Sequence, residues 1–203
     1  MKLYYSPGVC SLSPHIVLRE AGLNFDLEKV DLATGKTESG KTVGDVHAKG
    51  YVPILELDDG ETLTEGAAIV QYIADALAPG KNLAPANGTI GRTRVQEHLS
   101  FVGAELHKSF TPFFKADSTD AEKQKARAKL DRRLGDIETL LSDGRQYLMG
   151  DDFTVADAYL YTVATWTRPT EIGLDAWPNL AAYVDRVAQR PAVQEALRAE
   201  GLA

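Results

Sequence analysis

Residues 1–21 read MKLYYSPGVCSLSPHIVLREA, and they contain the first clear secondary-structure signals of the chain. Residues 2–5 form a short β-prone run that Ser6-Pro7-Gly8 interrupts. The apolar spacing of residues 11–21 suits a helix, which Gly22 would close. The stretch therefore predicts a strand, a turn and a helix, with the only cysteine of the chain at the start of that helix.

Cys10 has two interpretations at that place. The N–H groups and dipole of a helix start favour an anion, and such a position lowers a thiol pKa from about 8.5 into a range of roughly 3.5 to 7.5. A lone cysteine can equally be a small buried hydrophobe, and position alone leaves the two balanced. Ser13 stands where a Cys-x-x-Cys redox pair has its second sulfur, so redox chemistry would need the sulfur of a small thiol.

In the first 80 residues the spacing of apolar residues changes often, which indicates short elements. Residues 25–30 predict a second strand, and residues 31–50 are too rich in glycine for a long element. Residues 54–63 predict a hairpin around an Asp-Asp-Gly turn, and residues 67–77 predict a helix. A strand-helix-strand start implies a parallel pair, to which the hairpin adds antiparallel edges.

Beyond Pro79-Gly80 every pattern is helical. One apolar stripe runs over residues 95–110 and stops at Pro112, and a second runs over residues 126–141. Residues 154–157 resemble a capping box that opens a helix to about residue 166, with Phe153 as its staple. Two more helices are predicted to begin at Pro178 and Pro191. We therefore expect an α/β plus all-α chain, with an α/β domain over residues 1–80 and an all-helical domain over residues 86–203.

The chain carries 22 Lys and Arg against 29 Asp and Glu, a net charge of −7, which argues against nucleic acid as a partner. Residues 1–80 account for −6 (6 minus 12) and residues 81–203 for −1 (16 minus 17), which also favours a boundary near residue 80. No apolar run approaches the roughly 18 residues of a membrane span, and no secretory signal is evident. One cysteine and four scattered histidines predict neither a disulfide nor a metal site. We expect a cytoplasmic protein without a membrane partner.

Two weaker motifs precede the predicted hairpin and the helix after it. A cis Val52-Pro53 bond would expose the Val52 backbone to an extended peptide, although most such bonds are trans. At Thr64-Glu65-Gly66, a helix start could bind a carboxylate and the Glu65 side chain could pair with an ammonium group. Taken alone, Glu65 is more simply a partner of the helix dipole.

A competing motif spans residues 35–42, GKTESGKT, which match the phosphate-binding P-loop pattern. A P-loop should open a long helix, yet residues 43–50 contain two glycines and no apolar stripe. Such a fold also needs a larger parallel sheet. Nucleotide binding is therefore the least favoured function.

His107 directly follows the stripe residue Leu106, so it should lie at the edge of the stripe. Its spacing of nine from His98 puts the two imidazoles on opposite sides of a helix, where they cannot share a ligand. Spacing alone favours a structural or solvated histidine.

Together these motifs resemble the bacterial beta-class glutathione S-transferases, in order and along the whole chain. The resemblance rests on SPGVCSLSPHIVLREA (6–21), LTEGAAIVQYIAD (63–75), ELHKSF (105–110), FTVADAYLY (153–161) and QRPAVQEALRAEGL (189–202). It implies a thioredoxin-like N-terminal domain, a helical C-terminal domain, a homodimer, and glutathione bound in the cleft between domains.

The resemblance also assigns roles to single residues. Cys10 would contact the glutathione sulfur and could form a mixed disulfide, and His107 would point at that sulfur. Val52 would pair with the cysteinyl part through its backbone, and Glu65 and Gly66 would hold the γ-glutamyl end. The remaining glutathione-binding positions it implies are Lys36, Tyr51, Ser100, Ala104 and Lys108.

The chain departs from the family in three places. It has Gly35-Lys36 where two basic residues are usual, His47-Ala48 where Asn-Pro is usual, and Ser100 where Asn is usual. These departures bear on the strength of glutathione binding rather than on the fold.

The function predicted from the sequence is conjugation of glutathione to hydrophobic electrophiles, with thiol transfer, peroxide reduction or dehalogenation through Cys10 as further activities. Phe113 and Trp166 are candidates for the apolar wall of the second substrate, although aromatics in such positions are more often core residues, and neither is assigned that role. The alternative is a non-catalytic binding protein of the same fold, and a P-loop nucleotide binder comes third.

Overall fold

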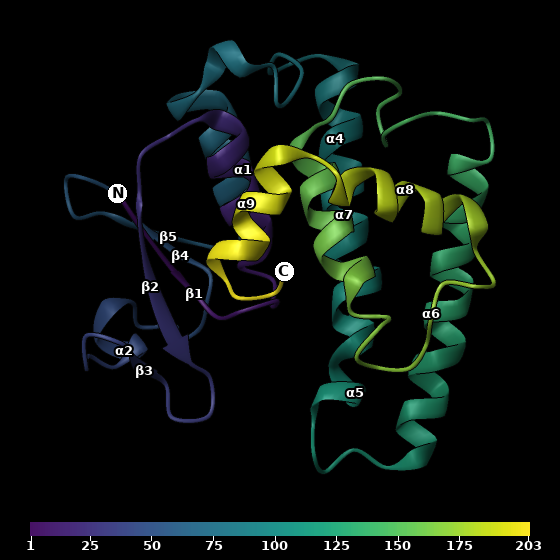
Figure 1. Ribbon diagram of the computed structural model, residues 1–203, viewed down its shortest axis with the longest axis horizontal. Coiled ribbons are helices and arrows are strands. Elements are labelled where there is room, and N and C mark those ends of the chain that lie inside the picture. The colour runs from purple at the N-terminus through teal and green to yellow at the C-terminus, as the bar shows by residue number, and fades with distance from the viewer. The chain divides into compact units, whose positions relative to one another are not determined.

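The computed structural model describes all 203 residues, which form two compact units (Figure 1). One unit comprises residues 1–84 and 189–203, and the other comprises residues 85–188. Helix α9 (Pro191–Ala199) thus belongs to the unit that also holds the first strand of the chain.

The first unit contains a five-stranded sheet in the order β3-β2-β1-β4-β5. The central strand β1 runs parallel to β2 and antiparallel to β4, with Leu3 opposite Leu27 on one side and Leu55 on the other. The parallel pair and the hairpin predicted from the sequence are both confirmed. The strands are β1 (Lys2–Tyr5), β2 (Asp26–Asp31), β3 (Lys36–Thr37), β4 (Ile54–Glu56) and β5 (Thr62–Thr64).

Three helices connect these strands or follow them. α1 (Leu12–Ala21) ends at Gly22, whose φ of 68° is the left-handed conformation that glycine adopts without strain. α3 (Gly66–Tyr72) continues as a π-helical turn over Ile73–Leu77. α2 (Val43–Val46) has four residues, so the P-loop-like motif opens no long helix, as its glycine content predicted.

The C-terminal tail corrects the predicted division of the chain. Residues 189–203 were expected in the helical domain, but α9 packs against α1, as Figure 1 shows. Two interactions explain the placement. Val193 and Ala196 of α9 are buried, and the Arg190 guanidinium donates to the Glu20 carboxylate at 2.5 Å. The apolar face of α9 and the ion pair between Arg190 and Glu20 therefore attach the tail to the α/β unit.

The second unit is entirely helical in its regular elements. Both predicted apolar stripes are buried, from Val95 to Phe110 and from Ala126 to Leu141. No helix of the structure combines the length and the apolar character needed to cross a bilayer. The elements are α4 (Ile90–Phe101), a π-helical turn (Val102–Leu106), a 3-10 turn (His107–Phe110), α5 (Thr111–Phe114), α6 (Asp120–Leu141), α7 (Val155–Thr165) and α8 (Pro178–Ala188).

One helix end differs from the prediction. Pro112 was expected to stop the long stripe, but it lies in the first turn of α5 instead. The first turn of a helix needs no N–H donor, so proline is tolerated there. The stripe itself is one continuous path of helical turns that changes from α to π to 3-10 geometry, which its apolar spacing did not reveal.

Candidate functional site

Cys10 lies in the turn between β1 and α1, directly before the helix start that the sequence predicted. The Ser13 N–H donates to the Cys10 carbonyl at 3.2 Å, and the Leu12 N–H donates to the Val9 carbonyl at 2.9 Å. Ser11 fastens the base of the turn, because its buried hydroxyl donates to the Ser6 carbonyl and accepts from the Ser6 N–H, each at 3.1 Å. The thiol is therefore carried by a backbone loop that is hydrogen-bonded on both sides.

Val52 is brought next to this thiol. The Cys10 Sγ donates to the Val52 carbonyl at 3.6 Å, although 42 residues separate the two along the chain. The Val52–Pro53 bond is cis, the form that sequence analysis had raised against the commoner trans form. The Val52 side chain packs into a core cluster with Tyr4, Val30, Val43 and Ile54. The core thus fixes the backbone group that faces the thiol.

Glu65 begins α3 in an unusual backbone conformation. Its φ of 69° is in the left-handed region, which costs a residue with a side chain about 1 to 3 kcal/mol and clusters at functional sites. The Glu65 carboxylate accepts from the Tyr51 hydroxyl at 2.5 Å and from the Lys49 ammonium at 3.4 Å. The hydrogen bond to Glu65 raises the pKa of Tyr51. Sequence analysis missed Lys49, because nothing local links it to a residue 16 positions later.

Gly66 links the region around Val52 to the region around Glu65. A Cβ on Gly66 would lie 3.8 Å from the Pro53 ring, so the start of α3 packs on the proline that follows Val52. The structure therefore brings Cys10, Val52, Tyr51, Glu65 and Gly66 into one continuous region of the α/β unit. Lys36 is apart from it, on the edge strand β3, where its exposed side chain makes no hydrogen bond or ion pair.

In the helical unit, His107 lies in an aromatic setting. Its Nδ1 is 2.8 Å from the Tyr159 hydroxyl, and its ring meets the Trp166 ring edge-on, with 4.8 Å between centroids. The Phe110 and Phe114 rings also meet the Trp166 ring edge-on, with 5.7 and 5.6 Å between ring centroids. His107 is neither a solvated surface histidine nor a core residue, because it is half-buried with one ring nitrogen held by a neighbour.

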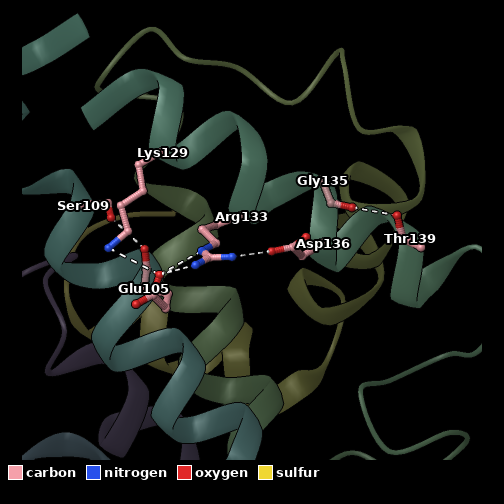
Figure 2. Close-up of polar contacts among 7 residues, drawn as sticks. All are labelled: Glu105, Ser109, Lys129, Arg133, Gly135, Asp136 and Thr139. Atoms are coloured by element: carbon pink, nitrogen blue, oxygen red, sulfur yellow. Dashed lines mark hydrogen bonds and ion pairs between the residues drawn. The ribbon is translucent and has the colours of Figure 1, made fainter. Parts of the chain in front are cut away.

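The π-helical turn directly before His107 is anchored on α6 through Glu105. The Glu105 carboxylate is 3.4 Å from the Lys129 ammonium and 2.8 Å from the Arg133 guanidinium. Arg133 also pairs with Asp136 (Figure 2). The hydrogen bond from Arg133 lowers the pKa of Glu105. These ion pairs hold the turn that contains Glu105 against α6. The remaining predicted positions, Ser100, Ala104 and Lys108, are all exposed.

Two residues that contact the His107 ring, Tyr159 and Trp166, were not predicted from the sequence to do so. Tyr159 was part of a motif that carried the resemblance, but its distance of 52 residues from His107 gave no local signal. Trp166 was one of two candidates for the apolar wall of the second substrate, and such aromatics are more often core residues. The structure buries it beside His107 and leaves Phe114 half-exposed, while Phe113 is only partly buried.

Comparisons with known proteins show which family and fold the chain resembles. Family models described as the N-terminal and C-terminal domains of glutathione S-transferase match residues 8–76 and 101–191. Glutathione S-transferase GstA of Escherichia coli O157:H7 is 46% identical over 202 residues, covering 100% of both chains. A sphingomonad glutathione S-transferase complexed with glutathione is 48% identical with a TM-score of 0.95, and covers all of both chains. A bacterial beta-class enzyme of Sphingomonas chungbukensis is 49% identical with a TM-score of 0.96, again over the full length of both.

Proposed function

The chain belongs to the glutathione S-transferase family, and from this premise we propose that it is a beta-class enzyme that joins the glutathione sulfur to hydrophobic electrophiles. The observation that carries the proposal is the placement of Cys10 before α1, with its Sγ 3.6 Å from the Val52 carbonyl. A thiol at a helix start, next to backbone groups that suit an extended peptide, matches the needs of a small thiol peptide.

The α/β unit would recognise the peptide part of glutathione. The Val52 backbone would pair with the cysteinyl residue, and the Glu65 carboxylate would receive the ammonium of the γ-glutamyl residue. Glu65 suits this role because its side chain is 61% exposed and already accepts from a hydroxyl and an ammonium group. A bond between two charged groups is stronger than a neutral one, so Glu65 would contribute affinity as well as orientation.

From the helical unit, we propose that Ser100, Ala104, His107 and Lys108 contact the same substrate. His107 would donate a hydrogen bond to the glutathione sulfur or accept its proton, with Tyr159 fixing the ring. In conjugation, the thiolate forms a bond to an electrophilic carbon, and the leaving group departs with the electron pair of its own bond. Stabilising the thiolate speeds this step, because the thiolate rather than the thiol is the nucleophile.

Cys10 supports a second reaction of the same site. Its thiolate would attack one sulfur of oxidised glutathione, forming a mixed disulfide and releasing the other half as glutathione thiolate. A second glutathione thiolate would then regenerate Cys10 and oxidised glutathione. No internal thiol competes, since Cys10 is the only cysteine of the chain.

Intact mass spectrometry after incubation with oxidised glutathione tests the proposal, together with conjugation of an aryl halide. We expect a single glutathione adduct on the wild type and none on Cys10→Ala. Conjugation should fall only partly in Cys10→Ala, because His107 still acts on the glutathione sulfur. The absence of both adduct and conjugation in the wild type would support the alternative, a non-catalytic binding protein of the same fold.

The proposal includes a homodimer in the cytoplasm. Sedimentation velocity of the purified chain checks the first part: a species of twice the mass of 22.1 kDa is expected, and a monomer at micromolar concentration contradicts it. Cell fractionation checks the second part.

A further inference from the structure

The end of the chain returns to the turn that carries Cys10. The Glu200 side chain is fully buried in the α/β unit, and one of its carboxylate oxygens accepts from the Gly8 N–H at 2.8 Å. Its other oxygen is 2.8 Å from Nδ1 of His15, which is fully buried in α1. Glu200 thus joins three segments: the C-terminal tail, the first helix, and the backbone two residues before the thiol.

The direction of these hydrogen bonds follows from Arg19. Its Nε–H donates to the His15 Nε2 at 3.4 Å, so in the neutral ring the proton sits on Nδ1 and is donated to Glu200. The Glu200 carboxylate therefore accepts two hydrogen bonds, one from the buried His15 ring and one from the partly buried Gly8 N–H. Such charge-assisted bonds are about twice as strong as neutral ones, and leaving their donors unpaired is unfavourable.

Glycine suits position 8 in this contact for two reasons. Its φ of 71° is accessible to glycine without strain, and a Cβ there would lie 3.6 Å from the Leu202 side chain. The tail therefore covers Gly8 with an apolar group and also binds its N–H. From Gly8 the chain has only Val9 before it reaches Cys10.

We propose that Glu200 is a positioning residue for Cys10. By holding the Gly8 N–H and His15 together, it fixes the turn from Pro7 to Cys10 against α1, and so sets the direction of the thiol toward the Val52 carbonyl. The consequence for catalysis rests on the function proposed above, whereas the consequence for the thiol itself does not.

The chain offers a matched control in Arg190. Arg190 and Glu20 also link the tail to α1, with hydrogen bonds of 2.5 and 2.9 Å, but neither touches Gly8 or the Cys10 turn in these contacts. Loss of either link should loosen α9 on α1. Only loss of Glu200 should change the chemistry of the thiol.

The experiment compares Glu200→Ala, Glu200→Gln and Arg190→Gln with the wild type. Hydrogen exchange measures the amides of residues 6–12, and iodoacetamide alkylation measures the rate of Cys10 against pH. We expect residues 6–12 to exchange roughly tenfold faster or more in Glu200→Ala, since a bond to a charged group is lost. The alkylation profile should also change in that variant. Glu200→Gln keeps one acceptor oxygen, so it should change both readouts in the same direction but less, and it decides the case if the alanine variant does not fold.

Arg190→Gln should lower the melting temperature while leaving both readouts as in the wild type. The proposal is overturned if both sites alter Cys10 alkylation in proportion to their loss of stability, or if the Glu200 variants leave it unchanged. Neither readout needs glutathione. A wild type that forms no adduct and conjugates nothing would therefore count against the proposed function, while the alkylation data would still decide the role of Glu200.

Discussion

Two carboxylates stand at the starts of two helices, Glu65 before α3 and Asp157 in the first turn of α7. The Glu65 side chain is 61% exposed and is held by two exposed side chains. Asp157 is fully buried and accepts from the Leu148 and Thr154 N–H groups at 2.8 Å each. It also accepts from the Thr154 and Tyr183 hydroxyls at 2.9 Å each.

The difference shows how burial separates two roles for one chemical group. Burial raises the pKa of Asp157, which its four hydrogen bonds oppose. Both carboxylate oxygens of Asp157 accept hydrogen bonds from groups of the protein. Asp157 therefore fixes the start of α7, the helix that carries Tyr159. Glu65 remains accessible at its helix start, and a carboxylate there is available for a charged ligand.

The largest expected effect is on stability, from Asp157→Ala. The variant leaves several buried donors without an acceptor and removes a helix cap, so the free energy of unfolding should fall by on the order of 3 kcal/mol or more. Urea denaturation measures it. Asp157→Asn keeps one acceptor oxygen and should lose less. A loss of under about 1 kcal/mol in the alanine variant would remove the proposed contrast with Glu65.

The next effect is on binding, from Glu65→Ala. Loss of a bond between charged groups should raise the glutathione Kd roughly tenfold or more, while the free energy of unfolding changes by less than about 1 kcal/mol. Calorimetry and urea denaturation give the two numbers. Glu65→Gln tests the charge alone, because its amide oxygen can still accept from Tyr51. Unchanged affinity in both variants would refute the assigned role.

A smaller effect is expected from Tyr159→Phe. The variant removes the hydroxyl 2.8 Å from the His107 Nδ1, a bond of about 1 kcal/mol, so kcat for conjugation should fall roughly fivefold. Tyr161→Phe is the control: Tyr161 is also buried in α7 but makes no hydrogen bond through its hydroxyl. Equal effects of both variants would point to packing alone.

The smallest effect is expected at the P-loop-like motif. ATP with magnesium should leave the melting temperature unchanged in the wild type and in Lys41→Ala, whereas glutathione should raise it in both. A rise with ATP that disappears in Lys41→Ala would revive nucleotide binding. Differential scanning fluorimetry is sufficient for this comparison.

Much of the fold was predictable because its signals are local. The hairpin follows from an Asp-Asp-Gly turn, and α6 buries the stripe from Ala126 to Leu141 that its spacing predicted. The capping box at Thr154 and Asp157 was likewise visible in four residues. In each case the residues that interact lie within one turn or one strand pair, so period and turn chemistry suffice.

The site was only partly predictable, for the same reason. Cys10 could be placed at a helix start, and the resemblance assigned Val52, Glu65 and His107. The contact between Cys10 and Val52 depends on how the sheet brings two loops together, and the setting of His107 depends on α7 packing against the turns that follow α4.

The sequence alone predicted four of the five strands, the helices that bury the two apolar stripes, and the solitary thiol at the start of the first helix, since these depend on neighbouring residues. The short elements β3, α2 and α5 were not predicted. Only the tertiary structure decided that the C-terminal tail joins the α/β unit and that Glu200 reaches Gly8 across 192 positions. A contact of that separation leaves no periodic trace in the chain. It exists because the apolar face of α9 and the buried His15 of α1 are complementary only once both helices have formed.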